Sequence, residues 1–296
     1  MDLLALRYFQ TVARLEHISR AAVELHVAQP SVSRTIARLE AELGVPLFDR
    51  QGRQIRLNQF GAAFLRRTDR ILGELDDARR EITDAAGLDQ GSVVVAAETL
   101  LTLTSLLAAY REQHPRVDVR LFQSTAVVMV EQLRNREVDL CVASQPLTGP
   151  ALHSVELMRE EVLLAAPLDH ELAGRERVDI AALAGEPFVT TRPGHWQREL
   201  ADRLFARAGL TPHIVCESDE PGASQDLISA GLGVGLVPSI SRRVATHAPV
   251  AWLHVEDPDC SRTLRLAWRD GAFLSLAARR FRDLAVETFR GFPAQT

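Results

Sequence analysis

The chain has 296 residues, which suits two or three domains and is too long for a single small one. With 46% hydrophobic and 25% charged residues it has the composition of a globular protein, and its net charge of −5 argues against a protein that coats nucleic acid. No apolar run approaches ~18 residues, no signal pattern follows Asp2, and the three cysteines form no CxxC motif. We therefore expect a cytoplasmic protein with no membrane contact, no disulfide framework, no metal ion and no cofactor.

The first 44 residues predict a helix-turn-helix. Apolar residues at helical spacing indicate a helix over Leu3–Leu15, and Ser19 is placed to cap a second, short helix. After a tight turn, a third helix begins at Gln29-Pro30, where proline suits the first turn, and ends at Gly44. A short helix, a tight turn and a second helix with polar residues at its start form the arrangement that places a recognition helix in the DNA major groove.

The exposed face of the third helix and the segment after it carry side chains suited to DNA. Glutamine can pair with adenine, arginine with guanine O6 and N7, and serine with bases or phosphates. Two short strands around a turn at Gln51-Gly52 predict a wing whose arginines would face the phosphate backbone. The alternatives are a solvated Arg38 and ion pairs on the wing surface for Arg50 and Arg53. The candidate DNA-binding residues are Gln29, Pro30, Ser31, Ser33, Arg34, Arg38, Arg50, Arg53 and Arg56.

This region resembles the DNA-binding signature of the LysR family of bacterial transcription regulators. The matching residues, at fixed spacing, are Ser19-Arg20-Ala21-Ala22, Val27-Ala28-Gln29-Pro30-Ser31-Val32-Ser33-Arg34, Ile36, Leu39-Glu40, Leu43-Gly44, Leu47-Phe48, Arg50 and Arg53. The family usually has serine where this chain has Ala28, so one cap or phosphate contact is lost. The resemblance implies a linker helix, commonly a tetramer, a two-lobed effector domain similar to periplasmic binding proteins (type 2), and contacts with RNA polymerase.

A long helix is predicted from Gln59, capped by Asn58, to about Ala86. Apolar residues recur along it at spacings of four and three, which is the seam of a coiled coil. The seam residues are Phe64, Thr68, Ile71, Leu75, Ala78, Ile82 and Ala85. A core helix of period ~3.6 is the alternative, but the charged flanks are too polar for burial on both sides. A seam on one chain requires a second, so we expect a homodimer that binds two half-sites, whereas the homotetramer is what the family resemblance implies.

From residue 91 onward strands and helices alternate, which predicts an α/β domain with parallel sheets behind the winged helix-turn-helix. The expected domains are 1–58 for DNA binding, 59–90 for the linker and 91–296 for the effector. The third would divide into a first lobe of about 91–162 and 268–296 and a second of about 163–267. Val162–Ala166 and Leu264–Trp268 are the expected crossing strands.

Ligands of open α/β sheets bind beyond the carboxyl ends of the strands, which locates the candidate effector site. The residues expected there are Thr99, Ser124, Thr125, Thr191, Gly194 and His195, with Glu98 and Thr190 beside them. Helix capping is the alternative for Ser124 and Thr125, and packing is the alternative for His195. Hydroxyls at helix N-termini favour a small carboxylate, whereas Glu98 favours an amine, so the expected effector is a carboxylate or an amino-acid-like metabolite.

The remaining motifs argue against an enzyme. No GxSxG, HExxH, Walker or metal-binding spacing occurs, and the glycine-rich stretch Gly231–Gly235 lacks the GxGxxG spacing. A solute carrier would need a signal peptide, which we do not find. Cys141 and Cys216 are expected in the core, and Cys216 with Cys260 is the only conceivable redox pair. We therefore expect a transcriptional regulator that binds double-stranded promoter DNA, a small-molecule effector and other copies of itself.

Overall fold

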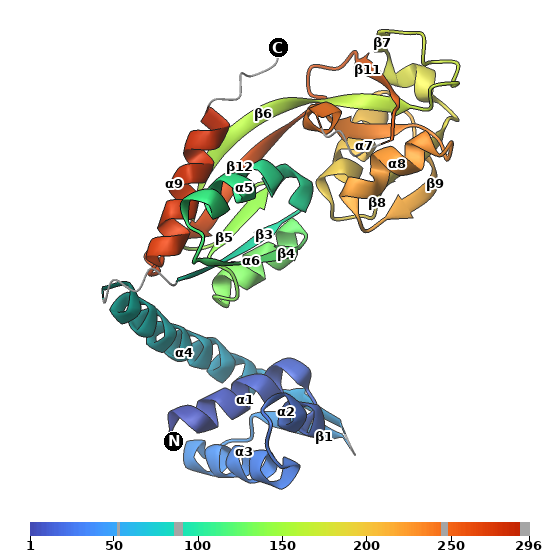
Figure 1. The fold of residues 1–296 in the computed structure, drawn as a ribbon. Helices are drawn as coiled ribbons and strands as arrows, with labels where there is room; N and C mark the ends of the chain where they lie inside the picture. The colour runs from blue at the N-terminus through green and yellow to red at the C-terminus, as the bar shows by residue number, and fades with distance from the viewer. Residues whose placement is uncertain (52–53, 86–90, 244–247, 291–296) are drawn as a thin grey trace. The chain divides into compact units, whose positions relative to one another are not determined.

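The computed structural model describes residues 1–51, 54–85, 91–243 and 248–290. The chain forms two compact units, Met1–Ala85 and Ala86–Thr296 (Figure 1). No helix in the described ranges is long and apolar enough to cross a membrane. Each unit has its own hydrophobic core, so each is described separately.

The first unit is a winged helix-turn-helix followed by a long helix. Its elements are α1 (Leu3–Leu15), α2 (Ile18–Glu24), α3 (Gln29–Leu43), β1 (Phe48–Gln51), β2 (Gln54–Leu57) and α4 (Gln59–Ala85). Phe9 lies at the centre of the core, with its ring centroid 5.6 Å from that of Phe48 and 5.0 Å from that of Phe64. Aromatic pairs at this separation pack the wing and α4 against α1.

The cap of α2 differs from the prediction. His17, and not Ser19, is the N-cap residue, and its Nδ1 accepts a hydrogen bond from the backbone N–H of Arg20 at 3.4 Å. The helix therefore begins at Ile18, one residue before the predicted cap. Serine is the more usual cap, but the extended backbone of His17 brings its ring nitrogen to the same free N–H group.

The junction between the wing and α4 is closely packed. The Asn58 side chain accepts from the N–H of Gly61 at 2.9 Å, as predicted for the helix cap, and donates to the carbonyl of Pro46 at 2.9 Å. A Cβ atom on Gly61 would lie 2.1 Å from the carbonyl oxygen of Leu47. Only glycine therefore lets α4 start this close to the wing, which sets the direction in which the helix leaves the domain.

Only part of the predicted seam on α4 is exposed. Thr68 is fully buried and Phe64 is half-buried in the core of the winged domain, so both are used within the chain. Leu72, which lies outside the predicted seam, is also buried. By contrast Ile71 is 47% exposed and Ile82 is 70% exposed. The unpartnered apolar face of α4 thus begins later than predicted.

The second unit has two lobes of α/β structure. The first lobe contains β3 (Ser92–Ala97), η1 (Leu100–Leu103), α5 (Thr104–Gln113), β4 (Asp118–Gln123), α6 (Ala126–Arg134), β5 (Leu140–Ala143) and α9 (Leu276–Arg290). The second contains β7 (Arg177–Val178), η2 (Ile180–Leu183), β8 (Pro187–Thr191), α7 (Trp196–Arg207), β9 (His213–Ser218), η3 (Pro221–Ala223), α8 (Ser224–Ser229), β10 (Gly235–Pro238), η4 (Ser239–Arg243) and β11 (Ala251–Val255).

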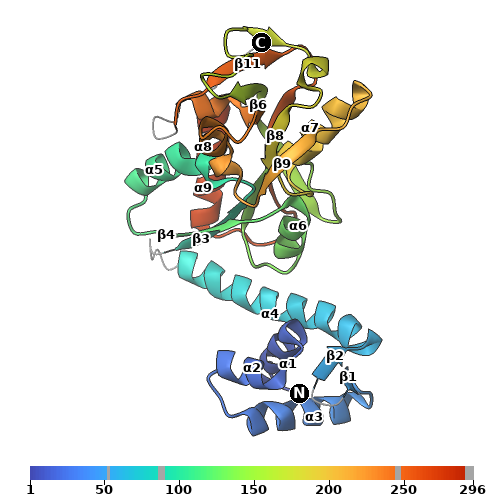
Figure 2. The same ribbon diagram turned by 90° about the vertical axis from the view of Figure 1, so that its right-hand side faces the viewer.

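Two long strands, β6 (Leu152–Ala166) and β12 (Ser261–Arg269), join the lobes (Figures 1 and 2). They belong to one eight-stranded sheet of order β4-β3-β5-β12-β6-β11-β7, with β10 also paired to β6. As predicted, parallel pairs occur in both lobes: β3 pairs with β4 and β5, and β8 pairs with β9. However, β12 is antiparallel to both β5 and β6, so the sheet is mixed. The reason is that the two crossing strands run in opposite directions between the lobes.

The position of the crossing follows from the two cores. Leu157, Leu264 and Leu266 pack in the core of the first lobe, whereas Val162 and Cys260 pack in that of the second. We propose that the chain crosses at about 159–161 and returns at about 261–263, so that 264–267 belong to the first lobe. This proposal places the return of the chain a few residues before the boundary expected after residue 267, because Leu264 and Leu266 pack in the core of the first lobe.

All three cysteines are free thiols. Cys141 in β5 and Cys260 before β12 are buried, and Cys216 is half-buried in β9. Burial raises the pKa of the Cys260 thiol to about 12, with the negative charge of Asp257 acting in the same direction, and burial also raises the pKa of Cys141. The reactive thiolate is disfavoured at both sites, which is the behaviour of core cysteines.

Candidate DNA-binding surface and effector site

The start of α3 is the exposed part of the helix-turn-helix. Gln29, Pro30 and Arg34 are exposed, whereas Ser31 and Ser33 are half-buried. Val32, Ile36 and Leu39 form the buried face, as the spacing predicted, whereas Leu43, which the same spacing predicts on this face, is exposed. Nε of Arg34 donates to the carbonyl of Pro30 at 3.2 Å, which holds this side chain along the first turn. An amide, two hydroxyls and a guanidinium are therefore presented together at one end of the helix.

Arg38 and the wing arginines differ from one another in their surroundings. Arg38 is exposed but lies 3.5 Å from a carboxylate oxygen of Asp2 and 3.9 Å from one of Glu42, so it could contact DNA only by leaving these acids. Arg56 is exposed on β2. The backbone of Arg50 lies in β1, while its side chain and all of Arg53 lie outside the described residues.

Three polar residues of the predicted effector site begin helices directly after strands. Thr99 precedes η1, Thr125 precedes α6 and His195 precedes α7, each with extended backbone at the N-cap position. None of these three side chains makes the capping hydrogen bond. The helix-capping alternative for Thr125 is thus not realised in the structure, and its hydroxyl is half-buried beside a helix N-terminus.

The second lobe contributes buried polar groups. Thr191 at the end of β8 is fully buried, and His195 is 7% exposed. Gly194 between them has a φ of +91°, a left-handed conformation that favours glycine and brings His195 to the start of α7. Burial lowers the pKa of His195, and the nearby positive charge of Arg192 lowers it further, so the imidazole is neutral at neutral pH.

The strand ends of the two lobes face each other. Gln123, at the end of β4 in the first lobe, donates to the carbonyl of Asp219 in the second at 3.2 Å. Arg262 of β12 lies over the ring of Trp196, the first residue of α7, at 4.7 Å. These contacts place the end of β4 and the start of α7 at the boundary between the lobes, and the effector site expected there stays a prediction.

A buried ion pair at this boundary was not predicted. Arg262 and Glu160 are direct partners in the register of β12 and β6, and each is about 95% buried. Nε and Nη2 of Arg262 donate to Oε1 of Glu160 at 2.8 and 2.7 Å, and Nη2 lies 3.4 Å from the hydroxyl of Thr102. The other oxygen of Glu160 accepts from the Ser239 hydroxyl and the Ile240 N–H. The signal available in the sequence was a pair of opposite charges, each two residues before an expected crossing strand.

Glu98 is the second buried carboxylate at the boundary. It is 1% exposed, and its Oε2 accepts from the backbone N–H of Ser144, at the end of β5, at 2.5 Å. Burial raises the pKa of Glu98, the hydrogen bond from Ser144 and the charge of Arg262 oppose this, and the charge of Glu199 on α7 adds to it. The carboxyl is therefore close to charged groups from both lobes.

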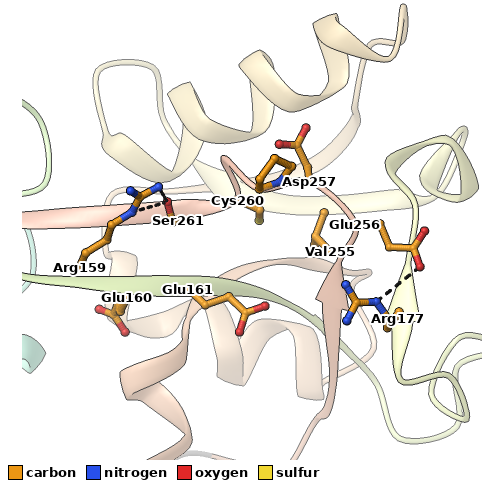
Figure 3. Close-up of a pocket in the computed structure, with 10 residues that line it drawn as sticks. Arg159, Glu160, Glu161, Arg177, Val255, Glu256, Asp257, Cys260 and Ser261 are labelled. Atoms are coloured by element: carbon orange, nitrogen blue, oxygen red, sulfur yellow. Dashed lines mark hydrogen bonds and ion pairs between the residues drawn. The ribbon is translucent and has the colours of Figure 1, made fainter. Parts of the chain in front are cut away.

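A separate pocket of about 760 Å³ is lined by residues 159–161 of β6, by Ser261 at the start of β12 and by residues of the second lobe (Figure 3). It contains none of the predicted effector residues. Its cations are occupied within the protein, because Arg159 donates to Ser261 at 3.0 Å and Arg177 lies 3.6 Å from Glu256. We therefore keep the strand ends, and not this pocket, as the candidate effector site. The lining residues are Arg159, Glu160, Glu161, Arg177, Val255, Glu256, Asp257, Pro258, Cys260 and Ser261.

Comparisons with known proteins assign both units. Residues 3–62 match the model of the bacterial regulatory helix-turn-helix protein, lysR family, and residues 86–290 match that of the LysR substrate binding domain. The chain is 35% identical to the HTH-type transcriptional regulator YybE of Bacillus subtilis over 292 residues, covering 98% of this chain and 99% of the relative. It is 32% identical to the transcriptional dual regulator GltC of the same organism over 293 residues, covering 98% of each chain.

Solved structures have the same architecture. A full-length OxyR variant from Pseudomonas aeruginosa aligns over 99% of this chain and 96% of its own length, with a TM-score of 0.73 and 23% identity, which shows the fold. Full-length CbnR in complex with its target DNA aligns over 98% of this chain and 100% of its own length, with a TM-score of 0.57 and 26% identity. With a helix-turn-helix domain and a two-lobed effector domain each matched along its length, the chain belongs to the LysR family of transcriptional regulators, which are not enzymes.

Proposed function

We propose that this regulator binds double-stranded promoter DNA as a homodimer or homotetramer, under the control of a small-molecule effector at the lobe boundary. Its contact with DNA would be made by the start of α3 and by the wing. The observation that carries the proposal is the exposed pair of Gln29 and Arg34, beside the half-buried Ser33, at one end of a helix whose other face is buried. On the family resemblance we also propose contacts with RNA polymerase at the promoter.

Dimerisation is supported by the apolar residues that α4 leaves exposed. Ile71 and Ile82 are 47% and 70% exposed, and Ala78 lies on the same stripe. Burying such a stripe against a second copy removes apolar area from water, and each Å² of this area contributes about 25 cal/mol of favourable free energy. Two copies would place two recognition helices on one duplex, with half-sites about one helical turn or a multiple of it apart.

Effector control is supported by the construction of the second unit. Only β6 and β12 join the lobes in the described chain. The boundary between the lobes contains buried charged and hydroxyl groups. A small molecule bound there would favour one arrangement of the lobes only if it binds that arrangement more tightly than others. The effector would contact Thr99, Ser124, Thr125, Thr191, Gly194 and His195.

The DNA-binding proposal can be tested with duplexes selected by the purified protein from a randomised library. Arg34→Ala should lose about 1–3 kcal/mol of discrimination at one base position, because arginine at this place can contact guanine. Arg56→Ala should weaken all sequences alike and reduce the slope of log affinity against log salt by about one unit, because it would remove one phosphate contact. Gel-shift titrations at several salt concentrations measure both effects.

Arg120→Ala is the matched control, because Arg120 is exposed on β4 of the effector domain. It should leave affinity, discrimination and salt slope unchanged. If Arg34→Ala keeps the relative affinities of variant sites, α3 is not the recognition helix. Footprints of a single unsymmetrical site bound by a monomer would contradict the dimer.

A further inference from the structure

The lobe boundary contains several buried polar atoms that the described protein leaves without a hydrogen bond. Oε1 of Glu98, Nη1 of Arg262 and Nε1 of Trp196 have no partner among the described residues, and all three side chains are at least 95% buried. A buried polar group without a partner destabilises the folded protein, and a ligand that hydrogen-bonds to such a group is the simplest reason for the protein to retain it.

These atoms belong to one cluster. Thr102 accepts from Arg262 and lies in the turn η1 that follows Glu98, so β12 and the end of β3 meet at this turn. The Arg262 guanidinium lies 4.7 Å from the Trp196 ring. No hydrogen bond or ion pair within the described chain joins Glu98 to Arg262, although the charge of Arg262 acts on the Glu98 carboxyl. Two opposite charges are thus close to each other and not bonded to each other.

The charges of the cluster favour a positive group beside Glu98. Both oxygens of Glu160 are saturated, Oε1 by Arg262 and Oε2 by Ser239 and Ile240, so this pair is closed. Glu98 then remains as a buried carboxylate whose hydrogen bonds, within the described chain, come from Ser144, the N–H of which donates to Oε2. A negative group at Glu98 would add a second unpaired charge to a buried site, whereas an ammonium group would neutralise it.

The open donors of the cluster favour a negative group on the same molecule. Nη1 of Arg262 and Nε1 of Trp196 can only donate, since guanidinium and indole nitrogens carry no acceptor. A carboxylate accepts from such donors, and its bonds to a guanidinium are among the stronger ones in proteins. Glu98 lies two residues before the turn η1 and Arg262 contacts Thr102 within this turn, so one small molecule with an ammonium and a carboxylate group suits both ends of the cluster.

We propose that the effector is a free α-amino acid, whose ammonium group binds Oε1 of Glu98 and whose carboxylate binds Nη1 of Arg262 and Nε1 of Trp196. This inference rests on the proposed function, because it names the chemical class of the ligand at the effector site. A zwitterion adds no net charge to the buried boundary, and its two groups contact residues of the first lobe, a crossing strand and the second lobe. Its binding would therefore hold the lobes together.

The experiment uses the full-length protein and a panel of the twenty common L-amino acids. Thermal-shift measurements identify those that raise the unfolding temperature, and calorimetry then gives their affinities. Each amino acid that binds is then compared with two analogues. One is the 2-hydroxy acid, in which a hydroxyl replaces the amine, and the other is the amine that lacks the carboxylate. At least one amino acid should bind about tenfold or more tightly than both analogues, because each analogue loses one charge-assisted contact.

Three variants assign the contacts. Glu98→Gln should weaken binding of the amino acid about tenfold or more, and it should reduce the difference in affinity between the amino acid and its hydroxy acid. Trp196→Phe keeps an aromatic ring under Arg262 but removes the N–H donor together with part of the indole ring, so it should weaken binding by a smaller factor than Glu98→Gln. Glu156→Gln is the control, since Glu156 is an exposed carboxylate on β6 paired with Arg265 at 2.8 Å, and it should bind as wild type does.

The proposal is overturned if no amino acid raises the unfolding temperature, if a hydroxy acid binds as tightly as its amino acid, or if Glu98→Gln binds the amino acid unchanged. DNA binding of the same preparations without ligand is measured separately. A protein that binds DNA normally but ignores every amino acid refutes the ligand class and leaves the regulator in place. A protein that responds to an amino acid but binds no duplex refutes the DNA-binding proposal alone.

Discussion

At the scale of single residues, the two buried carboxylates of the lobe boundary differ in how far the protein compensates their charge. Glu160 is saturated by Arg262, Ser239 and Ile240, so its charge is compensated. Glu98 receives one backbone hydrogen bond in the described chain, and burial raises its pKa. A charge retained in such a place opposes folding when no ligand is bound. The residue is therefore better explained by binding than by stability.

This difference gives a pH-dependent prediction for Glu98→Gln. Because the pKa of Glu98 is higher in the folded than in the unfolded protein, the folded state binds more protons between the two values. Stability then falls as pH rises through that window, and the loss persists at neutral pH. Without ligand, Glu98→Gln should unfold at a higher temperature than wild type at pH 7, and its advantage should shrink as pH falls toward the unfolded value of 4.5.

Urea or thermal unfolding at a series of pH values measures this advantage. The exposed Glu156→Gln variant serves as the control, and it should show no comparable gain. A wild-type protein that is more stable than Glu98→Gln at pH 7 would show that Glu98 contributes to folding through contacts that its burial does not reveal.

At the scale of elements, α4 shows what a periodic pattern can predict and what it cannot. The spacing correctly indicated a helix from Gln59, and the cap at Asn58 is confirmed. It did not distinguish residues that face α1 from residues that face solvent, because a period of ~3.5 and one of ~3.6 diverge little over two or three turns. Phe64 and Thr68 pack within the chain, and the exposed stripe begins at Ile71.

We predict that acidic residues on this stripe weaken self-association. The double variant Ile71→Glu, Ile82→Glu should shift the protein toward monomer, since like charges on a shared seam repel and the apolar area is lost. The double variant should also bind a duplex with two half-sites at least about tenfold more weakly, because binding of one copy no longer holds the recognition helix of a second copy near the DNA. Light scattering coupled to size exclusion measures the mass, and Arg66→Glu, at an exposed position on the opposite side of the helix from the stripe, is the control. An unchanged mass for the double variant would place the dimer contact elsewhere.

Apolar runs predicted some buried strands of the effector domain but not all of them. The sequence predicts strands over Val93–Ala97 and Asp139–Ala143, where the structure has β3 and β5, but it does not predict the apolar strand β11. The first half of β6 escaped prediction because its exposed polar residues, such as His153 and Glu156, interrupt the apolar pattern. Its stability comes from pairing with β12, which a local pattern does not contain. The short strand β7 has only two residues and was missed for the same reason.

At the scale of the whole molecule, the proposed effector site combines residues that are distant in sequence. Thr99, Thr125 and His195 were identified because they follow strands, and the rule about strand ends needs no tertiary information. Arg262 joins Glu98 and Trp196 at the boundary only through the register of β12 against β6. That register depends on the packing of both lobes, so the ion pair and its open donors could not be predicted from spacing.

The two units should also be separable, because their cores share no residue. The winged domain packs its core from α1 to α4, and every core of the second unit lies between residues 93 and 289. We predict that a fragment of residues 91–296 unfolds cooperatively on its own and binds the amino acid identified above within about twofold of the full chain, since all the proposed contacts lie inside it. Circular dichroism and calorimetry measure both properties, and the fragment should bind no duplex DNA. A fragment that is unfolded, or folded but unable to bind the ligand of the full chain, would mean that the effector site requires the DNA-binding unit or its dimer, and that the two functions are not carried by separate domains.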